Sequence, residues 1–298
     1  MEKDRNIILI GSIKAYKNYL RVLLKLYLKR RESFLNDNVL IKVILRDGRE
    51  MSVPYGWVTS FARMSAYQNN NISSLSLTKE GISFLYKGQP VLIYPGRFGG
   101  PNEVFMREDY SFLNVAGCDV IDIGMNTGDS TIYFALNGAK RVIGLEPYPY
   151  SFSYAEKNVK LNNLQNVIIL NAGYGKDSNI IVDDSKIPTN ASSLKASNKG
   201  GKEIPIYSLE TLIHKYEIRD AVLKMDCEGC EYNLLDEGED VLKRLEMIQI
   251  EYHYGYEKLK EKLEKSGMKV KYTKPVKVFN SDASNPNMTV GFIYAKRE

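Results

Sequence analysis

The chain has 298 residues, 44% hydrophobic and 26% charged, which is typical of a soluble globular protein with one or two domains. No apolar run approaches the roughly 20 residues that cross a bilayer, three cysteines do not make a disulfide scaffold, and the start does not resemble a secretory signal. Residues 1–31 hold nine Lys and Arg against two Asp and Glu, a net charge of +7, whereas the whole chain carries +5. The remainder is slightly acidic, which argues against a uniformly basic nucleic-acid-binding surface. We expect a cytoplasmic protein.

Residues 12–31 are predicted to form a basic amphipathic helix. Its apolar side chains recur at helical spacing with lysines and arginines between them. The apolar positions are Ile13, Tyr16, Leu20, Leu23, Leu24 and Tyr27. Such a helix can pack on its own protein, pair with a second copy, or lie on an anionic membrane surface. Peripheral membrane contact through this helix therefore stays open, as does the oligomeric state.

The rest of the first 115 residues predicts a small α+β module. Two hairpins are expected because short glycine-containing turns join apolar runs. The paired runs are residues 39–45 with 51–53 and residues 82–86 with 91–94. A short helix is expected over residues 55–64. We therefore predict an N-terminal module at residues 1–115 and a catalytic domain at residues 116–298.

The second domain begins with a strand, a glycine turn and a helix. Residues 120–123 form a short apolar strand that contains Asp122, and a turn bracketed by Gly124 and Gly128 follows. This arrangement brings backbone N–H groups close to a small ligand. The spacing differs from the dinucleotide motif Gly-x-Gly-x-x-Gly, and the Gly-Lys-Ser/Thr of a P-loop is absent. An acid in the strand and no lysine in the turn favour a cationic or zwitterionic ligand.

The next two strand ends extend this site. The strand at residues 141–146 ends in Glu146, 22 residues after Gly124, where an acid typically binds both ribose hydroxyls of a nucleoside. The strand at residues 167–171 ends in Asn171, which is expected beside the base. These features predict S-adenosylmethionine as the cofactor. Its predicted binding residues are Asp122, Gly124, Asn126, Gly128, Glu146 and Asn171. The alternative is that Asp122 and Glu146 only cap neighbouring helices.

The remaining segments predict one mostly parallel sheet with an antiparallel edge. Strands are expected at residues 204–207, 221–226, 247–252, 269–272 and 289–295, and helices at residues 150–161, 208–216 and 257–265. No helix separates the last two strands, which fits an antiparallel hairpin at the sheet edge. Residues 183–202 are interpreted as the loop of another hairpin, either a mobile flap or an ordinary insertion.

The candidate catalytic residues, Asp226 and His253, lie at neighbouring strand ends, where ligands of such sheets bind. His253 is the natural general base because an unperturbed pKa of about 6.5 leaves it mostly neutral at pH 7, although it could instead be structural. Asp226 orients the nucleophile or acts as a base itself. A divalent metal shared by Asp226, Glu251 and His253 is conceivable but not favoured.

Cys227 and Cys230 are three residues apart, with no second pair to complete a zinc site. A disulfide or redox pair is one alternative. Packing of two small residues beside a glycine is the favoured interpretation.

Four stretches resemble the FkbM family of S-adenosylmethionine-dependent methyltransferases. They are Val120-Ile-Asp-Ile-Gly-Met-Asn-Thr-Gly-Asp-Ser130, Gly144-Leu-Glu-Pro-Tyr-Pro149, Lys224-Met-Asp-Cys-Glu-Gly-Cys-Glu231 and Glu251-Tyr-His253. The third is the most specific, being similar to the family's Lys-Ile-Asp-Val-Glu-Gly-Ala-Glu. The family's Val and Ala at the two cysteine positions favour packing there. The resemblance covers roughly residues 100–298 and implies a class I, Rossmann-like α/β fold and O-methylation, often of sugars or natural products.

The leading hypothesis is an O-methyltransferase that acts on a hydroxyl of a glycan, glycolipid or secondary metabolite. An RNA methyltransferase is a second hypothesis, but the strand that ends at Asp226 lacks the Asn/Asp-Pro-Pro-aromatic turn common in base N-methylation. A third is a non-catalytic membrane- or partner-binding protein on the same fold. That hypothesis predicts that the acidic residues of the cofactor site would have been lost, yet Asp122 and Glu146 are both present.

Overall fold

The computed structural model describes residues 2–33, 38–67, 69–96, 100–182, 201–277 and 288–297. The chain divides into two units: residues 1–109 with 154–163, and residues 110–153 with 164–298. Helix α5 (Pro149–Leu161) therefore contributes to both units. The two-domain division predicted at residue 115 stays a prediction. No helix within these described ranges is long and apolar enough to cross a bilayer.

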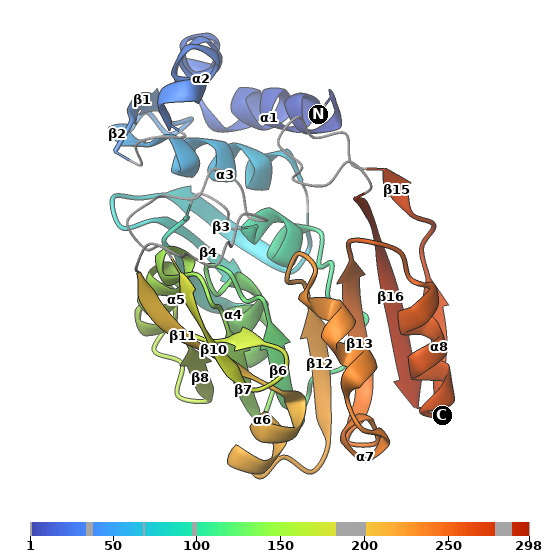
Figure 1. Cartoon of the computed structure of the whole chain (residues 1–298). Helices are drawn as coiled ribbons and strands as arrows, with labels where there is room; N and C mark the ends of the chain where they lie inside the picture. The colour runs from blue at the N-terminus through green and yellow to red at the C-terminus, as the bar shows by residue number, and fades with distance from the viewer. Residues whose placement is uncertain are drawn as a thin grey trace. The chain divides into compact units, whose positions relative to one another are not determined.

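The first unit begins with two helices, α1 (Glu2–Ala15) and α2 (Tyr19–Ser33), so the prediction of one helix over residues 12–31 was wrong (Figure 1). The helical path breaks at Tyr16, which forms an isolated β-bridge with Leu45. The Tyr16 ring is fully buried, and its hydroxyl donates to the carbonyl of Val58 at 2.9 Å. Apolar spacing continues through the break, and for that reason the sequence pattern did not reveal it.

Both predicted hairpins of the first unit are confirmed. They are β1 (Leu40–Ile44) with β2 (Glu50–Pro54), and β4 (Ile82–Tyr86) with β5 (Gln89–Ile93). Strand β3 (Ile72–Leu77), which the sequence analysis missed, pairs with β4. The predicted short helix is α3 (Tyr55–Ala66), and a π-helical turn, η1 (Asn102–Met106), follows the strands. Helices α1 and α3 approach closely, because a Cβ on Gly11 would lie 1.7 Å from the carbonyl oxygen of Ala62.

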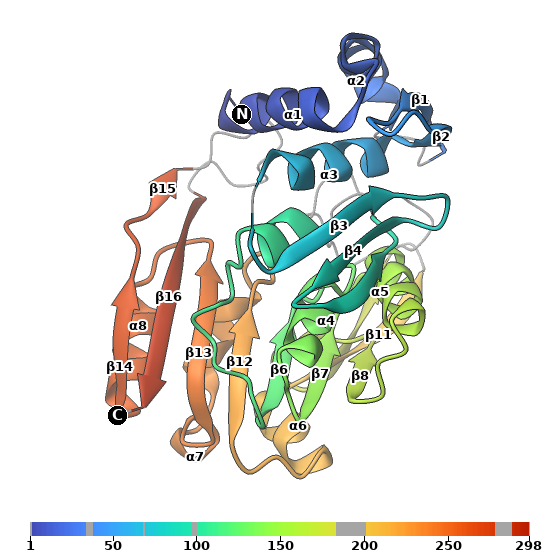
Figure 2. The ribbon, with the colours of Figure 1, turned by 180° about the vertical axis from the view of Figure 1, so that it is seen from behind.

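The second unit is built on one large sheet with the strand order β14–β16–β13–β12–β6–β7–β8 (Figure 2). These strands are β6 (Asp119–Ile123), β7 (Arg141–Leu145), β8 (Val167–Leu170), β12 (Ala221–Met225), β13 (Leu245–Tyr252), β14 (Met268–Tyr272) and β16 (Thr289–Arg297). The strands from β13 to β8 run parallel, and β16 lies antiparallel between β13 and β14. The short β15 (Val276–Lys277) pairs with β16. The predicted mostly parallel sheet with an antiparallel edge is confirmed.

Continuous burial explains the central strands. Every residue of β6 and β12 is buried, as expected for parallel strands covered on both faces. The accompanying helices are α4 (Asp129–Leu136), α6 (Leu209–Lys215), α7 (Glu239–Leu242) and α8 (Glu257–Lys265), with a 3-10 turn, η2 (Cys230–Asp236). Ser208 caps α6 and accepts a hydrogen bond from the N–H of Thr211 at 3.1 Å.

A smaller sheet joins β9 (Gly173–Tyr174), β11 (Lys202–Tyr207) and β10 (Ser178–Val182). Strands β10 and β11 form the hairpin that the sequence predicted. Most of the proposed flap, residues 183–200, lies outside the described residues.

Candidate functional site

The glycine turn, residues 124–128, joins β6 to α4 and is anchored to the end of β7. The N–H groups of Gly124 and Met125 both donate to the carbonyl of Leu145 at 3.0 Å. Gly124 and Gly128 have φ angles of +76° and +85°. A Cβ on Gly124 would lie 1.8 Å from the carbonyl oxygen of Asp226, so only glycine fits at this crossing of two chain segments.

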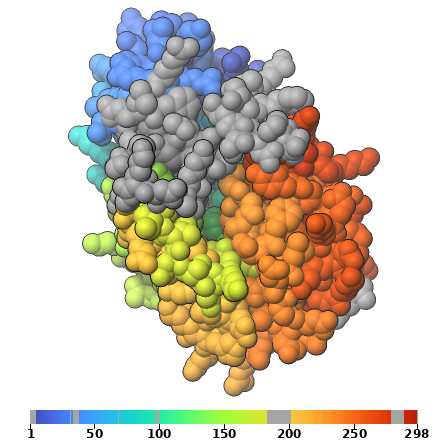
Figure 3. All heavy atoms as spheres, in the orientation of Figure 1, coloured from blue at the N-terminus to red at the C-terminus, as the bar shows by residue number. Residues whose placement is uncertain are grey.

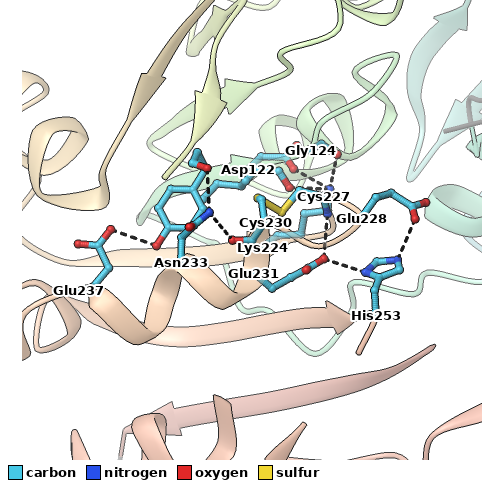
Figure 4. Close-up of a disulfide and its surroundings, with 12 residues drawn as sticks. Asp122, Gly124, Lys224, Cys227, Glu228, Cys230, Glu231, Asn233, Glu237 and His253 are labelled. Carbon is cyan, nitrogen blue, oxygen red and sulfur yellow. Dashed lines mark hydrogen bonds and ion pairs between the residues drawn. A yellow bond between two sulfur atoms is a disulfide. The ribbon is translucent and has the colours of Figure 1, made fainter. Parts of the chain in front are cut away.

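Asp122 lies fully buried next to the glycine turn. One carboxylate oxygen accepts hydrogen bonds from the hydroxyls of Ser130 and Thr131, both at 2.7 Å. The other lies 3.1 Å from the ammonium of Lys224, which also donates to the carbonyl of Gly124 at 2.7 Å (Figure 4). Asp122 therefore links the first turn of α4 to Lys224 of β12. These contacts hold the glycine turn, which lies between β6 and α4, in place.

The sequence analysis gave no role to Lys224, whose ammonium the structure places against Asp122 and the glycine turn. Burial disfavours its charged form, but the carboxylates of Asp122, Asp226 and Glu146 outweigh this effect and raise the pKa of Lys224. It is therefore a buried ammonium among acids. The sequence feature that could have indicated its role is a lysine inside an otherwise apolar strand, β12. In the pairing of β6 with β12, Lys224 lies opposite Asp122.

Glu146 follows β7 and is held by two backbone groups. Its oxygens accept hydrogen bonds from the N–H of Asn126 at 3.0 Å and from the N–H of Tyr148 at 2.9 Å. Burial raises the pKa of Glu146 to about 7, and the two donors oppose this rise. A carboxylate oxygen can accept about two hydrogen bonds, so each oxygen keeps capacity for a hydroxyl donor. These free acceptor positions suit the predicted contact with the ribose hydroxyls.

Asn171 supports the segment that follows β7. Its amide nitrogen donates to the carbonyls of Glu146 at 2.9 Å and Pro147 at 3.2 Å, and its oxygen accepts a hydrogen bond from Lys202 at 2.7 Å. Asn126 of the glycine turn is thus connected through Glu146 to Asn171. Their contact with a cofactor stays a prediction.

The acidic loop, residues 226–231, follows β12 and starts beside the glycine turn. The N–H of Asp226 donates to the carbonyl of Ile123 at 3.1 Å. Burial raises the pKa of the Asp226 carboxyl, and the positive charges of Lys224 and His253 oppose this rise. Glu228 and Gly229 both have positive φ angles, +56° and +121°. Left-handed backbone at a non-glycine residue is uncommon and is often found at functional sites.

His253 lies between two carboxylates of the acidic loop (Figure 4). Its Nδ1 is 2.8 Å from Glu231, which is fully buried, and its Nε2 is 3.3 Å from Glu228. Burial alone would lower the pKa of His253, but the hydrogen bond and charge of Glu231, followed by the charges of Glu228 and Asp226, raise it to about 9. The expectation of a mostly neutral histidine at pH 7 was therefore wrong. A catalytic role for His253 stays a prediction, and such a role would belong to an imidazolium.

Glu228 and Glu231 occur in the motif of the sequence analysis, but no role was predicted for either of them. The backbone N–H of Cys227 donates at 3.3 Å to Glu231 Oε1, the same oxygen that contacts His253. Burial raises the pKa of Glu228, against the positive charge of His253. The run of acids after β12 was the sequence feature that could have indicated these two residues. Their shared partner, His253, follows β13, and the spacing of the acids could not reveal it.

Cys227 and Cys230 form a disulfide, with their Cα atoms 5.5 Å apart (Figure 4). The preferred prediction of simple packing was wrong. The left-handed backbone at Glu228 and Gly229 reverses the chain and brings the two sulfur atoms together. The bond therefore closes the loop that carries Glu228.

The structure gives no support for a divalent metal shared by Asp226, Glu251 and His253. Among the residues that the structure describes, no three His, Cys, Asp or Glu side chains are grouped to hold a metal ion.

Comparison with known proteins gives consistent matches. The methyltransferase FkbM domain family matches residues 122–269. A putative protein N5-glutamine methyltransferase of Methanocaldococcus jannaschii is 30% identical over 124 residues, which are 35% of this chain and 61% of that relative. The chain thus spans less than two thirds of this relative's length.

Two solved structures are similar at lower identity. An rRNA methylase from Streptococcus thermophilus is 16% identical, with a TM-score of 0.39 over 67% of this chain and 97% of the other. M. jannaschii TYW2 in complex with AdoMet is 17% identical, with a TM-score of 0.38 over 76% of this chain and 93% of the other.

Proposed function

Because residues 122–269 belong to the FkbM family of S-adenosylmethionine-dependent methyltransferases, we propose that this chain transfers a methyl group to a hydroxyl of a glycan, glycolipid or secondary metabolite. The observation that carries this proposal is the acidic loop. Asp226 and Glu228 both have raised carboxyl pKa values and lie beside a cationic His253. A hydroxyl acceptor needs such a group because it must lose its proton as it is methylated.

The cofactor residues in this proposal are those of the glycine turn and its supports. S-adenosylmethionine supplies an electrophilic methyl group on a sulfonium. Glu146 would accept hydrogen bonds from the ribose hydroxyls, and Gly124 and Gly128 would allow close approach of the backbone. Asp122 acts indirectly in this proposal, because Ser130, Thr131 and Lys224 already contact its carboxylate.

The acceptor residues are those of the acidic loop. Asp226 would receive the hydroxyl proton while the acceptor oxygen bonds to the methyl carbon and the sulfur–carbon bond breaks. His253 is charged near neutral pH and would hold Glu228 and Glu231 in place as a positioning residue. Glu228 could take the place of Asp226 as proton acceptor, and the two carboxylates are separable by substitution.

Calorimetric titration of S-adenosylmethionine tests the cofactor half. We expect saturable binding by the wild type and loss of binding in Glu146→Ala. Hydroxyls donate better to an ionised carboxylate, so affinity should rise from pH 6 to pH 8, across the Glu146 pKa of about 7. Glu146→Gln should remove that rise. A folded wild type that binds no cofactor would contradict the proposal.

Transfer of a labelled methyl group tests the acceptor half. Panels of glycans, glycolipids, RNA and glutamine-containing peptides separate a hydroxyl acceptor from the nucleic-acid alternative and from the amide named for the M. jannaschii relative. Asp226→Asn should keep cofactor affinity and lose transfer by about a hundredfold or more. Glu228→Gln is the matched comparison that identifies the proton acceptor. Labelling of RNA or peptide alone would overturn the hydroxyl proposal.

A further inference from the structure

Helix α2 has one buried face and one exposed apolar face. Val22 and Leu26 are buried on the inner side, and the hydroxyl of Tyr55 donates to the carbonyl of Leu26 at 3.2 Å. The α2 stripe, defined as Leu20, Leu24, Tyr27 and Leu28, is 69%, 56%, 81% and 63% exposed, respectively. Packing within the chain therefore covers Val22 and Leu26 but leaves the α2 stripe exposed.

The stripe is continuous along the helix. At 3.6 residues per turn, its four side chains fall within an arc of about 100°. The segment of the chain that includes α2 is at the surface in Figure 3, where it is blue. Exposed apolar side chains are common singly, but a contiguous row of them indicates an interaction site.

Cations line one border of the stripe. Arg21 and Lys25 are exposed on the adjoining side of the helix, and neither forms an ion pair with any residue that the structure describes. Residues 19–33 hold five Lys and Arg and a single acid, Glu32, whose partner is Lys29. The surface therefore combines an apolar row with unneutralised positive charge.

We propose that the α2 stripe is a membrane-docking surface that binds anionic phospholipid. The apolar side chains would enter the boundary between headgroups and acyl chains, while Arg21 and Lys25 contact phosphate and carboxylate groups. Helix α2 has 15 residues and lies on the bilayer without crossing it.

Charge argues against a second copy of the chain as the occupant. Symmetric pairing of two α2 stripes would bring the cation rows of both copies close together, with one acid per helix to offset them. An anionic lipid surface supplies the missing negative charge. Membrane docking of α2 is independent of the methyl acceptor, because it involves no residue of the glycine turn or the acidic loop.

Cosedimentation of the full chain with vesicles tests the proposal. We expect binding to vesicles of 30% phosphatidylserine in phosphatidylcholine and little binding to pure phosphatidylcholine. Raising the salt from about 0.1 M to 0.5 M should weaken binding, because it shortens the screening length. No binding to the anionic vesicles, or equal binding to both compositions, would overturn the proposal.

Paired variants separate the two contributions. Arg21→Gln with Lys25→Gln should lower the partition coefficient about twenty-five-fold, at about fivefold per cation. Leu24→Ser with Leu28→Ser should lower it by roughly tenfold or more. All four positions are exposed, so these variants should fold; circular dichroism checks this. Lys258→Gln with Lys271→Gln, which removes two exposed cations elsewhere, is the matched control and should bind like the wild type.

Sedimentation velocity without lipid tests the remaining occupant. If the wild type forms a dimer that Leu24→Ser with Leu28→Ser dissociates, and the dimer does not bind vesicles, the stripe is a self-association surface and the membrane proposal fails. The membrane proposal would also be overturned if the control variant, Lys258→Gln with Lys271→Gln, lost as much vesicle binding as Arg21→Gln with Lys25→Gln.

Discussion

The glycine turn and the acidic loop are adjacent but are stabilised differently. In the glycine turn, backbone N–H groups of Gly124 and Met125 bond to Leu145, and the charge of Asp122 is matched by Lys224. In the acidic loop, three carboxylates share one imidazolium, His253, and the pKa values of Asp226 and Glu228 are raised. The first region is fixed by backbone hydrogen bonds and a paired charge, and the second holds carboxyl groups with raised pKa values around one histidine.

Under the proposed function, the two neighbouring strand ends have distinct tasks. A cofactor needs the same backbone positions in every catalytic cycle, whereas the acceptor side must bind a proton and release it. Substitutions in the glycine turn should therefore act first on stability. Substitutions in the acidic loop should act first on the dependence on pH.

The largest effect is expected for Lys224→Met. It removes the only cation beside buried Asp122 within the described part of the chain and leaves a carboxylate uncompensated, so the free energy of unfolding should fall by about 3–5 kcal/mol. Urea denaturation measures this loss. Asp122→Asn combined with Lys224→Met should recover most of it, because a neutral pair replaces the unpaired charge. Equal losses in the single and double variants would show that packing, and not charge, is responsible.

Gly124→Ala should follow, at about 3 kcal/mol. The substitution forces an L residue to a φ of +76° and places its Cβ 1.8 Å from the carbonyl oxygen of Asp226. Gly88→Ala is a matched control, with a φ of +80° and no atom within 4 Å of the new Cβ, and should cost only about 1 kcal/mol. Similar losses at both glycines would show that the two segments separate easily.

The sequence predicted the framework of the site better than its charges. Strands β6 and β12 follow from short apolar runs, and the glycine turn follows from spacing. The contact between Asp122 and Lys224 depends on a parallel pairing across 102 residues, which neither local sequence reveals. The same holds for His253, because its pKa is set by acids that follow a different strand.

The error at α1 and α2 has a related cause. Tyr16 satisfies the apolar periodicity of a continuous helix, yet its side chain is buried against α3 and its backbone bridges to Leu45. Periodicity identifies apolar positions but does not reveal which surface covers each one. For the same reason, the sequence could not show that Val22 packs inward while Leu24 stays exposed.

The pH dependence of His253 tests the charge of the acidic loop. Its pKa of about 9 lies above the ordinary value of about 6.5, so it contributes about 3 kcal/mol of stability. That stability is fully present below pH 6.5 and is lost as the pH rises through 9. Titration of the ring protons by NMR should show the raised value, with His214 as the second histidine to assign. Glu231→Gln should lower the pKa, and an ordinary pKa in the wild type would remove the contrast between the regions.

The smallest effect is expected for the disulfide between Cys227 and Cys230, which closes a loop across a sequence separation of only 3. A loop this short restricts the unfolded chain little, so reduction should lower the free energy of unfolding by about 2 kcal/mol. Alkylation of the unfolded, unreduced protein should modify Cys118 alone, and all three cysteines after reduction. Cys227→Ser with Cys230→Ser should make stability insensitive to reductant, whereas Cys118→Ser should leave the sensitivity unchanged. Three reactive thiols before reduction would show that the acidic loop folds without a covalent closure and that its backbone alone holds Glu228 near His253.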